Sequence, residues 1–465
     1  MERHRGRWRL AGHETEFVPG VLVIDENDRL SLELSGALGR ASHDVATSRL
    51  MRGTYRIVGE LENFSAVSLN GCFLRSSSSF SPVPSQIWHV HEAIFGVTFS
   101  PEEPWAFYDV SVVLPGLTRW VQWKTPESID EYNADGSAKR IGVSVPLLSW
   151  PLWNLDQIRV DLAMRAGTRQ RSDLITEVES SVMLRVRSPQ LIDGRQLQDA
   201  ATRPVQVLLG LATGHYTAMT RAEVTVAGAT PEERIARLPW RWQPLKGSLD
   251  PARARYAFTY NDLSALGESA LDSVRQQLAS IEPVLDLYVA ALRELSYAEL
   301  SFNVVVQALE TYHRSRHAGH VLPEEHWVPL KDELKKVITD ALASDRSLQP
   351  ARDTLCQRLT YFNEPSLRQR LKGLLASIEP HTSAVCGGDL TRFVQAVVDT
   401  RNYYTHWSAA LEGKALRGGG AVRLTSRLRA LLEILLLREL GFAADSTPER
   451  AILERRLSWL PEVWE

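Results

Sequence analysis

The pattern of apolar and polar positions changes once along the chain, and this change divides it into two parts. Over residues 1–190, short segments alternate apolar and polar side chains between turn signals of Gly, Pro, Asn and Ser. Such alternation is typical of strands with one buried face, whereas apolar spacings of three and four residues indicate helices. From about Leu263 the spacing is helical and stays so. The pattern predicts a β-rich part followed by a helical part.

The β-rich part, residues 1–190, contains no long helical pattern between its candidate strands. This spacing favours an antiparallel β-sandwich or jelly-roll-like domain over a parallel α/β sheet. We expect strands at 30–34, 54–61, 64–74, 89–99, 105–114, 141–148, 158–164 and 182–188. The serine run at 76–79 is predicted to be a solvated loop.

Residues 191–297 have a mixed pattern, and we predict a connecting region with helices. The first helix is expected to be interrupted before Pro204, and a further strand is expected at 222–226. The stretch 228–251 holds several prolines, which predict an irregular segment on the surface.

Residues 298–465 are predicted to form an all-α helical bundle, which makes the whole chain an α+β multidomain protein. Upstream of this bundle, Pro283 is expected to begin another helix, because the first turn of a helix tolerates a missing amide hydrogen. Asp389 is a candidate N-cap. Helices are expected at 298–316, 330–343, 366–378, 390–405, 421–440 and 447–457.

The composition is ordinary for a soluble protein, with 44% hydrophobic and 23% charged residues in a chain of 465. A formal net charge of −3 means that any RNA-binding charge must be local. The three cysteines form no CxxC pair, which favours a reducing compartment over disulfides or a zinc ribbon. The start MERHRGRWRL lacks the apolar core of a signal peptide, and no apolar run approaches a membrane span. We expect a cytoplasmic protein with no membrane partner.

The segment 390–407 carries the candidate chemistry. Its apolar stripe falls at Leu390, Phe393, Val394, Val397 and Val398. Arg401 is the next position on that stripe, since eleven residues from Leu390 make about three turns. A guanidinium on an apolar stripe is costly unless it is paired or faces a cleft. Arg401 therefore needs a functional or structural partner.

His406 lies five residues after Arg401, about 140° around a regular helix. The two side chains are expected to line two walls of a groove at the helix end. Hydrogen-bonding groups and stacking surfaces are expected around them from Asn402, Tyr403, Tyr404, Thr405 and Trp407. The spacing alone does not distinguish this site from a structural arginine beside a helix-terminal histidine. Glu310 is either a partner that holds Arg401 in position or an ordinary solvent-facing glutamate.

Other chemistries find little support in the sequence. His313, His317 and His320 share a helical spacing that could bind zinc, but arginines lie among them and the HExxH order is absent. His89 and His91 alternate on a strand without a carboxylate at matching spacing. There is no P-loop, no GxGxxG after a strand and no GxSxG elbow. We expect no metal and no cofactor.

Three segments resemble a known family. DTRNYYTH at 399–406 resembles the motif of the HEPN superfamily (higher eukaryote and prokaryote nucleotide-binding domains), in which an Arg, often followed by a polar residue, precedes a His by four to six residues. FNVVVQALETYHR at 302–314 is similar to the first helix of the HEPN domain in ApeA-type anti-phage proteins. LPGLTRWVQW at 114–123 resembles part of the N-terminal domain of that family.

The resemblance implies a metal-independent endoribonuclease with Arg401 and His406 as catalytic residues. Asn402, Glu310, Tyr403 and Thr405 would support them. The implied products are a 2′,3′-cyclic phosphate and a 5′-hydroxyl. HEPN ribonucleases generally form composite sites from two copies, so the resemblance implies at least a homodimer. RNA is the implied substrate, and the family makes tRNA a substrate worth testing.

Taken together, these features predict a bacterial abortive-infection effector in which the β-rich domain senses a phage-derived trigger. Two other hypotheses remain open. In one, the helical domain binds a nucleotide or RNA without cutting it. In the other, the β-domain is a ligand-binding sandwich whose aromatic side chains bind a sugar or peptide, and the helices only oligomerise.

Overall fold

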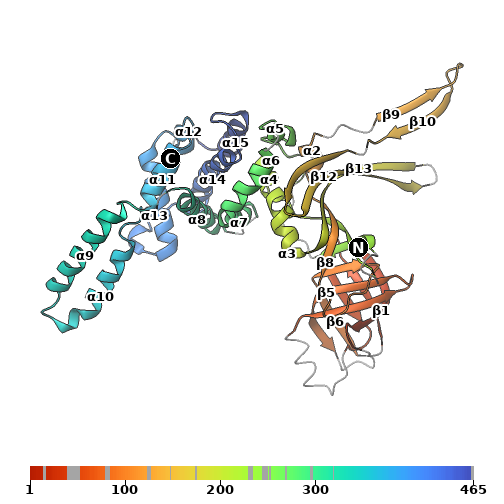
Figure 1. The fold of residues 1–465 in the computed structure, drawn as a ribbon, viewed down its shortest axis with the longest axis horizontal. Coiled ribbons are helices and arrows are strands. Elements are labelled where there is room, and N and C mark those ends of the chain that lie inside the picture. The colour runs from red at the N-terminus through yellow and green to blue at the C-terminus, as the bar shows by residue number, and fades with distance from the viewer. Residues whose placement is uncertain are drawn as a thin grey trace. The chain divides into compact units, whose positions relative to one another are not determined.

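The computed structural model describes residues 1–13, 17–38, 53–78, 84–122, 127–146, 148–172, 175–228, 234–242, 250, 253–267, 270–293, 297–317 and 319–461. The chain divides into two compact units, Met1–Asp272 and Ser273–Glu465. The first unit is built on antiparallel strands and the second is helical (Figure 1). The predicted change from strands to helices is therefore confirmed. The predicted connecting region contributes to both units.

The first unit contains one large sheet and a separate pair of strands. The large sheet comprises β1 (Glu2–Leu10), β2 (Val18–Ile24), β3 (Leu30–Leu34), β4 (Tyr55–Leu61), β5 (Ala66–Ser78), β6 (Ser85–Val90), β7 (Glu92–Phe95), β8 (Ala106–Val113), β11 (Ser149–Leu155), β12 (Ile158–Ser172), β13 (Ile175–Asp193), β14 (Arg221–Ala227) and β15 (Arg234–Trp242). The pair comprises β9 (Glu127–Tyr132) and β10 (Ala138–Ser144).

The first six strands close into a barrel. They pair in the order β5-β4-β1-β2-β3-β6, and β6 pairs again with β5. Trp8 lies opposite Gly59, where a Cβ would come within 2.3 Å of the indole ring. Only glycine leaves room for that ring. The barrel core consists of Trp8, Leu10, Leu22, Ile24, Leu30, Leu32, Leu34, Leu38, Ile57, Leu61, Val67, Leu69, Cys72, Leu74, Trp88, Val90 and Ala93.

The sheet continues from β5 through β7, β15, β14, β8, β13 and β12 to β11. The antiparallel β-rich class that we predicted is confirmed. In detail, a barrel passes into an open sheet, so the strands do not form two separate facing sheets. Short helices connect the strands: α2 (Leu117–Trp120), α3 (Gly194–Leu197), the π-helical turn η1 (Gln198–Thr202) and α4 (Arg203–Thr213). Helix α5 (Tyr260–Ser264) follows the last strand. The π-helical turn stands where we predicted an interruption before Pro204.

Two local predictions in this unit are wrong. The segment predicted to be irregular contains β15, in which buried Leu238 and Trp240 flank exposed Pro239. We predicted an irregular segment because of the prolines in and around this strand, and therefore missed its alternation of buried and exposed residues. The serine run was predicted to be a loop, but Ser76–Ser78 continue β5 and pair with β6. They are exposed, so no apolar pattern marks them as a strand. Ser79 lies outside the described residues.

The second unit is helical. Its helices are α6 (Ala270–Ser280, which begins just before the division between the units), α7 (Glu282–Leu292), α8 (Ala298–Arg316), α9 (Glu324–Ala341), α10 (Gln349–Arg358), α11 (Leu367–Ala376), α12 (Thr382–Cys386), α13 (Leu390–His406), α14 (Gly419–Glu439) and α15 (Thr447–Leu457). Short 3-10 turns are η2 (Arg346–Leu348), η3 (Leu359–Tyr361) and η4 (Ala409–Leu411). Helix α14 is buried almost all round and forms the centre of the unit. Within the described residues, no helix combines the length and the apolarity that crossing a membrane requires.

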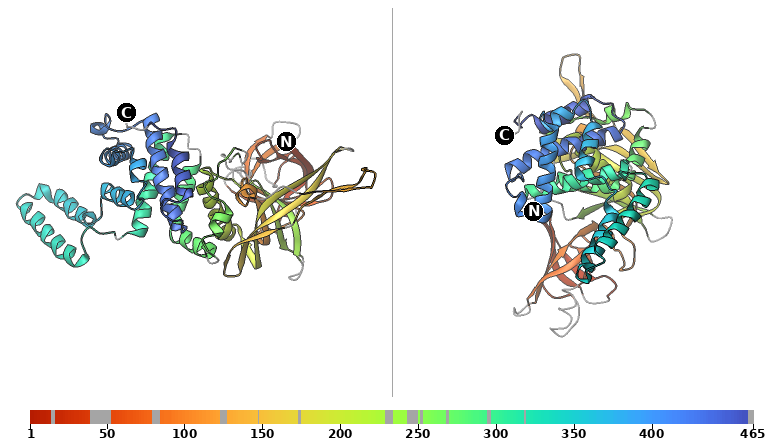
Figure 2. Two further views of the ribbon diagram at one scale, coloured as in Figure 1. Left: turned by 90° about the horizontal axis from the view of Figure 1, so that it is seen from above. Right: turned by 90° about the vertical axis from the view of Figure 1, so that its left-hand side faces the viewer.

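Helices α9 and α10 pack on each other as a hairpin that projects from the rest of the helical unit (Figures 1 and 2). In α9 the buried side chain is Trp327, and α10 buries none of those described. The hairpin contributes little to the core of this unit.

Among the described residues of the helical unit, two carboxylates are fully buried. Glu433 of α14 accepts hydrogen bonds from Arg455 (3.1 Å) and Arg456 (2.5 Å) of α15 and from the Tyr288 hydroxyl of α7 (3.1 Å). Burial opposes its ionisation, but Arg456 and Arg455 lower the pKa of Glu433 to about 2. This cluster joins three helices through one charged group.

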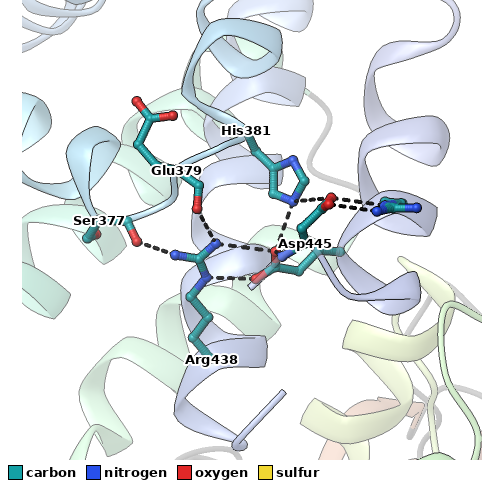
Figure 3. A network of polar contacts seen from close by, with 7 residues as sticks. Ser377, Glu379, His381, Arg438 and Asp445 are labelled. Carbon is teal, nitrogen blue, oxygen red and sulfur yellow. Dashed lines mark hydrogen bonds and ion pairs between the residues drawn. The ribbon is translucent and has the colours of Figure 1, made fainter. Parts of the chain in front are cut away.

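Glu449 of α15 is the second buried carboxylate (Figure 3). Arg438 of α14 donates to it at 2.7 Å, and His381, at the start of α12, lies 2.9 Å away. The backbone N–H of Asp445 donates to it at 2.8 Å. Arg438 also donates to the carbonyl oxygen of Glu379 at 3.0 Å. The cluster fastens the segment before α12 to the last two helices.

Candidate active site

Helix α13 positions the predicted site. Its N-cap, Asp389, accepts a hydrogen bond from the backbone N–H of Arg392 at 2.9 Å, as we predicted from the sequence. Its fully buried face runs through Phe393, Val394, Val397, Thr400 and Tyr403. Leu390, which we placed on the apolar stripe, is exposed because it lies in the first turn, at the edge of the unit. Arg401 flanks the buried face.

Arg401 points toward α8. Its Nη2 lies 3.9 Å from Oε2 of Glu310, and the two side chains are 31% and 24% exposed. That distance is an ion pair without a hydrogen bond. Its Nη1 donates to Oδ1 of Asn402 at 3.2 Å. The guanidinium is therefore held from two sides while its Nη2 hydrogens stay available to another acceptor.

His406 is the last residue of α13 and is exposed. Within the described residues, its imidazole takes part in no hydrogen bond or ion pair. Thr405, also exposed, donates from its hydroxyl to the carbonyl oxygen of Arg401 at 2.8 Å and so closes the last turn. An imidazole exposed to water at the end of the helix that carries Arg401 can exchange protons with a bound substrate.

Trp407 ends α13 in the left-handed conformation, with φ 50° and ψ 38°. Its backbone N–H donates to the carbonyl oxygen of Tyr403 at 2.6 Å. Glycine is the usual residue at such a helix end, and another residue costs about 1–2 kcal/mol there. The turn directs the chain away from the helix immediately after His406.

The segment after this turn folds back on α13. The backbone N–H of Leu416 donates to the Thr400 hydroxyl at 3.0 Å, and its carbonyl oxygen accepts from the Tyr404 hydroxyl at 3.2 Å. The guanidinium of Arg417 lies 4.7 Å above the Tyr403 ring and contacts the Tyr403 hydroxyl. Sequence analysis missed Leu416 and Arg417. The clue was the buried Thr400, whose hydroxyl needs a partner.

A second polar group lies farther along α8. His313, one turn after Glu310, is buried, and its Nδ1 lies 3.2 Å from Nη1 of Arg370 on α11. Burial lowers the pKa of His313 to about 4, and His317 and Arg370 add to this shift. The histidine is therefore neutral near pH 7 and can accept a hydrogen bond from Arg370. Arg370 also donates to Glu364 at 3.3 Å.

The zinc hypothesis weighed for the α8 histidines finds no support in this geometry. His313 faces an arginine, which repels a cation. No group of three or more metal-ligating side chains is found in the part of the chain that the structure describes.

A β-rich unit is followed by a helical unit in which an Arg-x4-His pair ends a core helix, which is the arrangement expected of a HEPN-domain protein with a large N-terminal domain. Residues 304–446 match the family Apea-like HEPN. Residues 3–273, more than half of the chain, match the family ApeA N-terminal domain 1. The chain therefore belongs to the ApeA-type HEPN family of anti-phage proteins. No curated protein and no solved structure matches it.

Proposed function

We propose that this protein is a metal-independent endoribonuclease whose catalytic residues are Arg401 and His406. The proposal rests on the exposure and the pairing of these two side chains. Arg401 is half-buried and only loosely paired with Glu310, and His406 is exposed at the end of the same helix. Both remain available to a substrate, unlike Arg456, which donates two hydrogen bonds to buried Glu433.

The chemistry fits these residues. The ribose 2′-oxygen attacks the adjacent phosphorus while a base takes its proton. The bond from phosphorus to the 5′-oxygen then breaks as an acid protonates that oxygen. Histidine can be base or acid near neutral pH, and arginine stabilises the charge on the phosphoryl oxygens with paired donors. The products are a 2′,3′-cyclic phosphate and a 5′-hydroxyl.

Two proton transfers favour two imidazoles, because one histidine cannot easily be base and acid in the same step. A second copy of the chain would supply the other His406 and the other Arg401. We therefore propose a homodimer, or a larger assembly, as the active form. Asn402 and Glu310 would orient Arg401, while Tyr403 and Thr405 would fix the end of α13.

The substrate class that we propose is RNA, with tRNA as the first candidate. An unregulated ribonuclease would damage its own host, so we propose that a phage-derived trigger acts through the β-rich unit. Cleavage would then halt translation in the infected bacterial cell.

The test compares wild type with Arg401→Ala and His406→Ala on total RNA in EDTA, with and without phage lysate. Wild type should leave cyclic phosphate ends, and either substitution should reduce cleavage by at least about a hundredfold. Exposed Arg392 on the same helix and exposed His326 on α9 provide matched controls. Arg392→Ala and His326→Ala should cleave like wild type.

A folded wild-type protein that cuts no RNA under either condition would favour the binding-module hypothesis. Cleavage that stops in EDTA, or ends that carry a 5′-phosphate, would contradict the proposed chemistry. In either case, RNA binding by the same variants would show whether Arg401 and His406 still contact RNA.

A further inference from the structure

Trp407 follows His406 directly and is 71% exposed. Tryptophan offers a large apolar surface, and its exposure to water is unfavourable unless something covers it. The other exposed aromatic side chains beside a helix end in this unit, such as Trp459, are not next to the candidate active site in the chain. Trp407 thus presents an uncovered indole at the place where substrate must bind.

The backbone gives no reason for a tryptophan at this position. The left-handed turn needs only the hydrogen bond from the residue 407 N–H to the Tyr403 carbonyl, which any residue can make. Glycine would adopt φ 50° without strain. A bulky side chain in a strained conformation is a feature that accumulates at functional sites. The indole itself therefore needs an explanation.

The indole of Trp407 packs against two tyrosine rings. Its ring centre lies 5.5 Å from that of Tyr403 and 6.1 Å from that of Tyr404. Tyr403 is buried, and Tyr404 is fixed through its hydroxyl to the Leu416 carbonyl and by the Phe302 ring at 6.5 Å. A rigid aromatic surface loses little freedom when a planar ligand stacks on it.

We propose that Trp407 forms a nucleobase subsite, where one unpaired base next to the cleaved bond stacks on the indole. This inference rests on the proposed function and names its substrate form: single-stranded RNA, such as a loop. Bases in a duplex are already stacked on their neighbours, whereas unpaired bases stack readily on aromatic side chains. Arg417 lies over the Tyr403 ring and pairs with exposed Glu412 at 3.0 Å, a surface ion pair that it can exchange for a phosphate of the RNA backbone. Trp407 acts as a positioning residue for the phosphate that Arg401 and His406 contact.

The experiment measures binding apart from cleavage. A short, fluorescently labelled oligoribonucleotide with every 2′-hydroxyl methylated cannot be cleaved by 2′-oxygen attack, and anisotropy gives its affinity for the full-length protein. Trp407→Ala should weaken binding by about fivefold to a hundredfold, the range seen when one stacked base is lost. Trp407→Phe should retain most of the affinity. Annealing the oligonucleotide to its complement should remove the difference between wild type and Trp407→Ala.

Two variants separate stacking from folding. Trp407→Gly relieves the backbone strain, so it should fold at least as well as wild type and yet bind as weakly as Trp407→Ala. Trp459→Ala removes another exposed tryptophan of the same unit and should bind like wild type. If residue 407 served only to end the helix, Trp407→Gly would bind like wild type.

A series of oligonucleotides with one abasic nucleotide at successive positions locates the stacked base. At one position, the abasic nucleotide should weaken binding to wild type but should not change binding to Trp407→Ala. Equal affinity and equal cleavage by wild type, Trp407→Ala and Trp407→Gly would overturn the subsite while leaving the ribonuclease intact. A protein that binds the oligonucleotide through Trp407 but cleaves no unmodified RNA would overturn the proposed function instead.

Discussion

Glu433 and Glu310 are both carboxylates of the helical unit that face arginines, but their surroundings differ. Glu433 is fully buried and accepts four hydrogen bonds or ion-pair contacts at 2.5–3.1 Å from Arg455, Arg456 and Tyr288. Glu310 is 24% exposed and lies 3.9 Å from one arginine. The first carboxylate has no capacity left for another partner, whereas the second leaves its arginine free to bind one.

This contrast separates a structural charge cluster from a candidate catalytic one. Buried charges persist only when their partners are numerous and close, because desolvation is costly. A catalytic arginine must exchange its resting partner for a phosphate, so a close, saturated pair would oppose substrate binding. Spacing along the chain cannot tell the two cases apart, but the number and length of the contacts can.

The largest effect is expected at Glu433. Glu433→Ala leaves Arg455 and Arg456 without their buried partner and should cost about 3–5 kcal/mol of the free energy of unfolding. Urea unfolding, followed by circular dichroism, measures this loss. Arg450→Ala is the control, since it removes an exposed partner of Asp445 and should cost less than about 1 kcal/mol. Equal losses in the two variants would show that burial does not distinguish these pairs.

An intermediate effect is expected from the pH dependence of His313. Its pKa is about 4 in the folded protein and 6.5 in the unfolded chain. Between these values the unfolded chain binds a proton and the folded protein does not, so stability falls as the pH falls through this window. The expected loss is roughly 1–3 kcal/mol.

The measurement compares the urea midpoints of wild type and His313→Gln at about pH 7 and about pH 5. Glutamine can still accept from Arg370 but does not titrate, so the variant should lose less stability on acidification. His326→Gln, at an exposed position on α9, should behave like wild type. The same loss in wild type and His313→Gln would assign the pH dependence to other groups.

The smallest effect on stability is expected at Glu310. Glu310→Gln removes a half-exposed, long ion pair and should change the free energy of unfolding by less than about 1 kcal/mol. If Glu310 positions Arg401, kcat/KM for RNA cleavage should nevertheless fall about tenfold. The matched control is Glu364→Gln, which weakens the Arg314 and Arg370 pairs without touching Arg401. Unchanged cleavage in Glu310→Gln would make Glu310 an ordinary surface residue.

The parts of the fold that sequence analysis predicted are those with local causes. Helix α8 has the predicted bounds, and α13 begins at its predicted N-cap, because caps and apolar spacing act within a few residues. Strand β3 likewise has its predicted bounds. In the site, Arg401 and His406 were predicted on one helix, which the structure retains, while their catalytic role came from the family resemblance.

The remaining features depend on residues far apart in the chain. Closure of the barrel needs β6 to pair with β5 as well as β3, and no local pattern encodes that second pairing. The partners of Glu449, which are His381, Arg438 and the Asp445 backbone, come from three separate segments, so its burial could not be predicted. The exposed indole of Trp407 depends on a backbone turn that a helical pattern does not reveal.

Barrel closure also limits how copies of the protein can aggregate through the edges of their sheets. Closing the ring leaves β11 as the terminal strand of the large sheet in the described part of the chain, where the Pro151 carbonyl accepts from the Tyr260 hydroxyl at 2.9 Å and the Asn154 N–H donates to Asp272 at 3.3 Å. An open strand edge is a template for unwanted pairing with another molecule. Pro151 lies within β11 and has no N–H to donate, which makes this edge a poor template. The same strand that ends the sheet thus protects the protein against edge-to-edge aggregation.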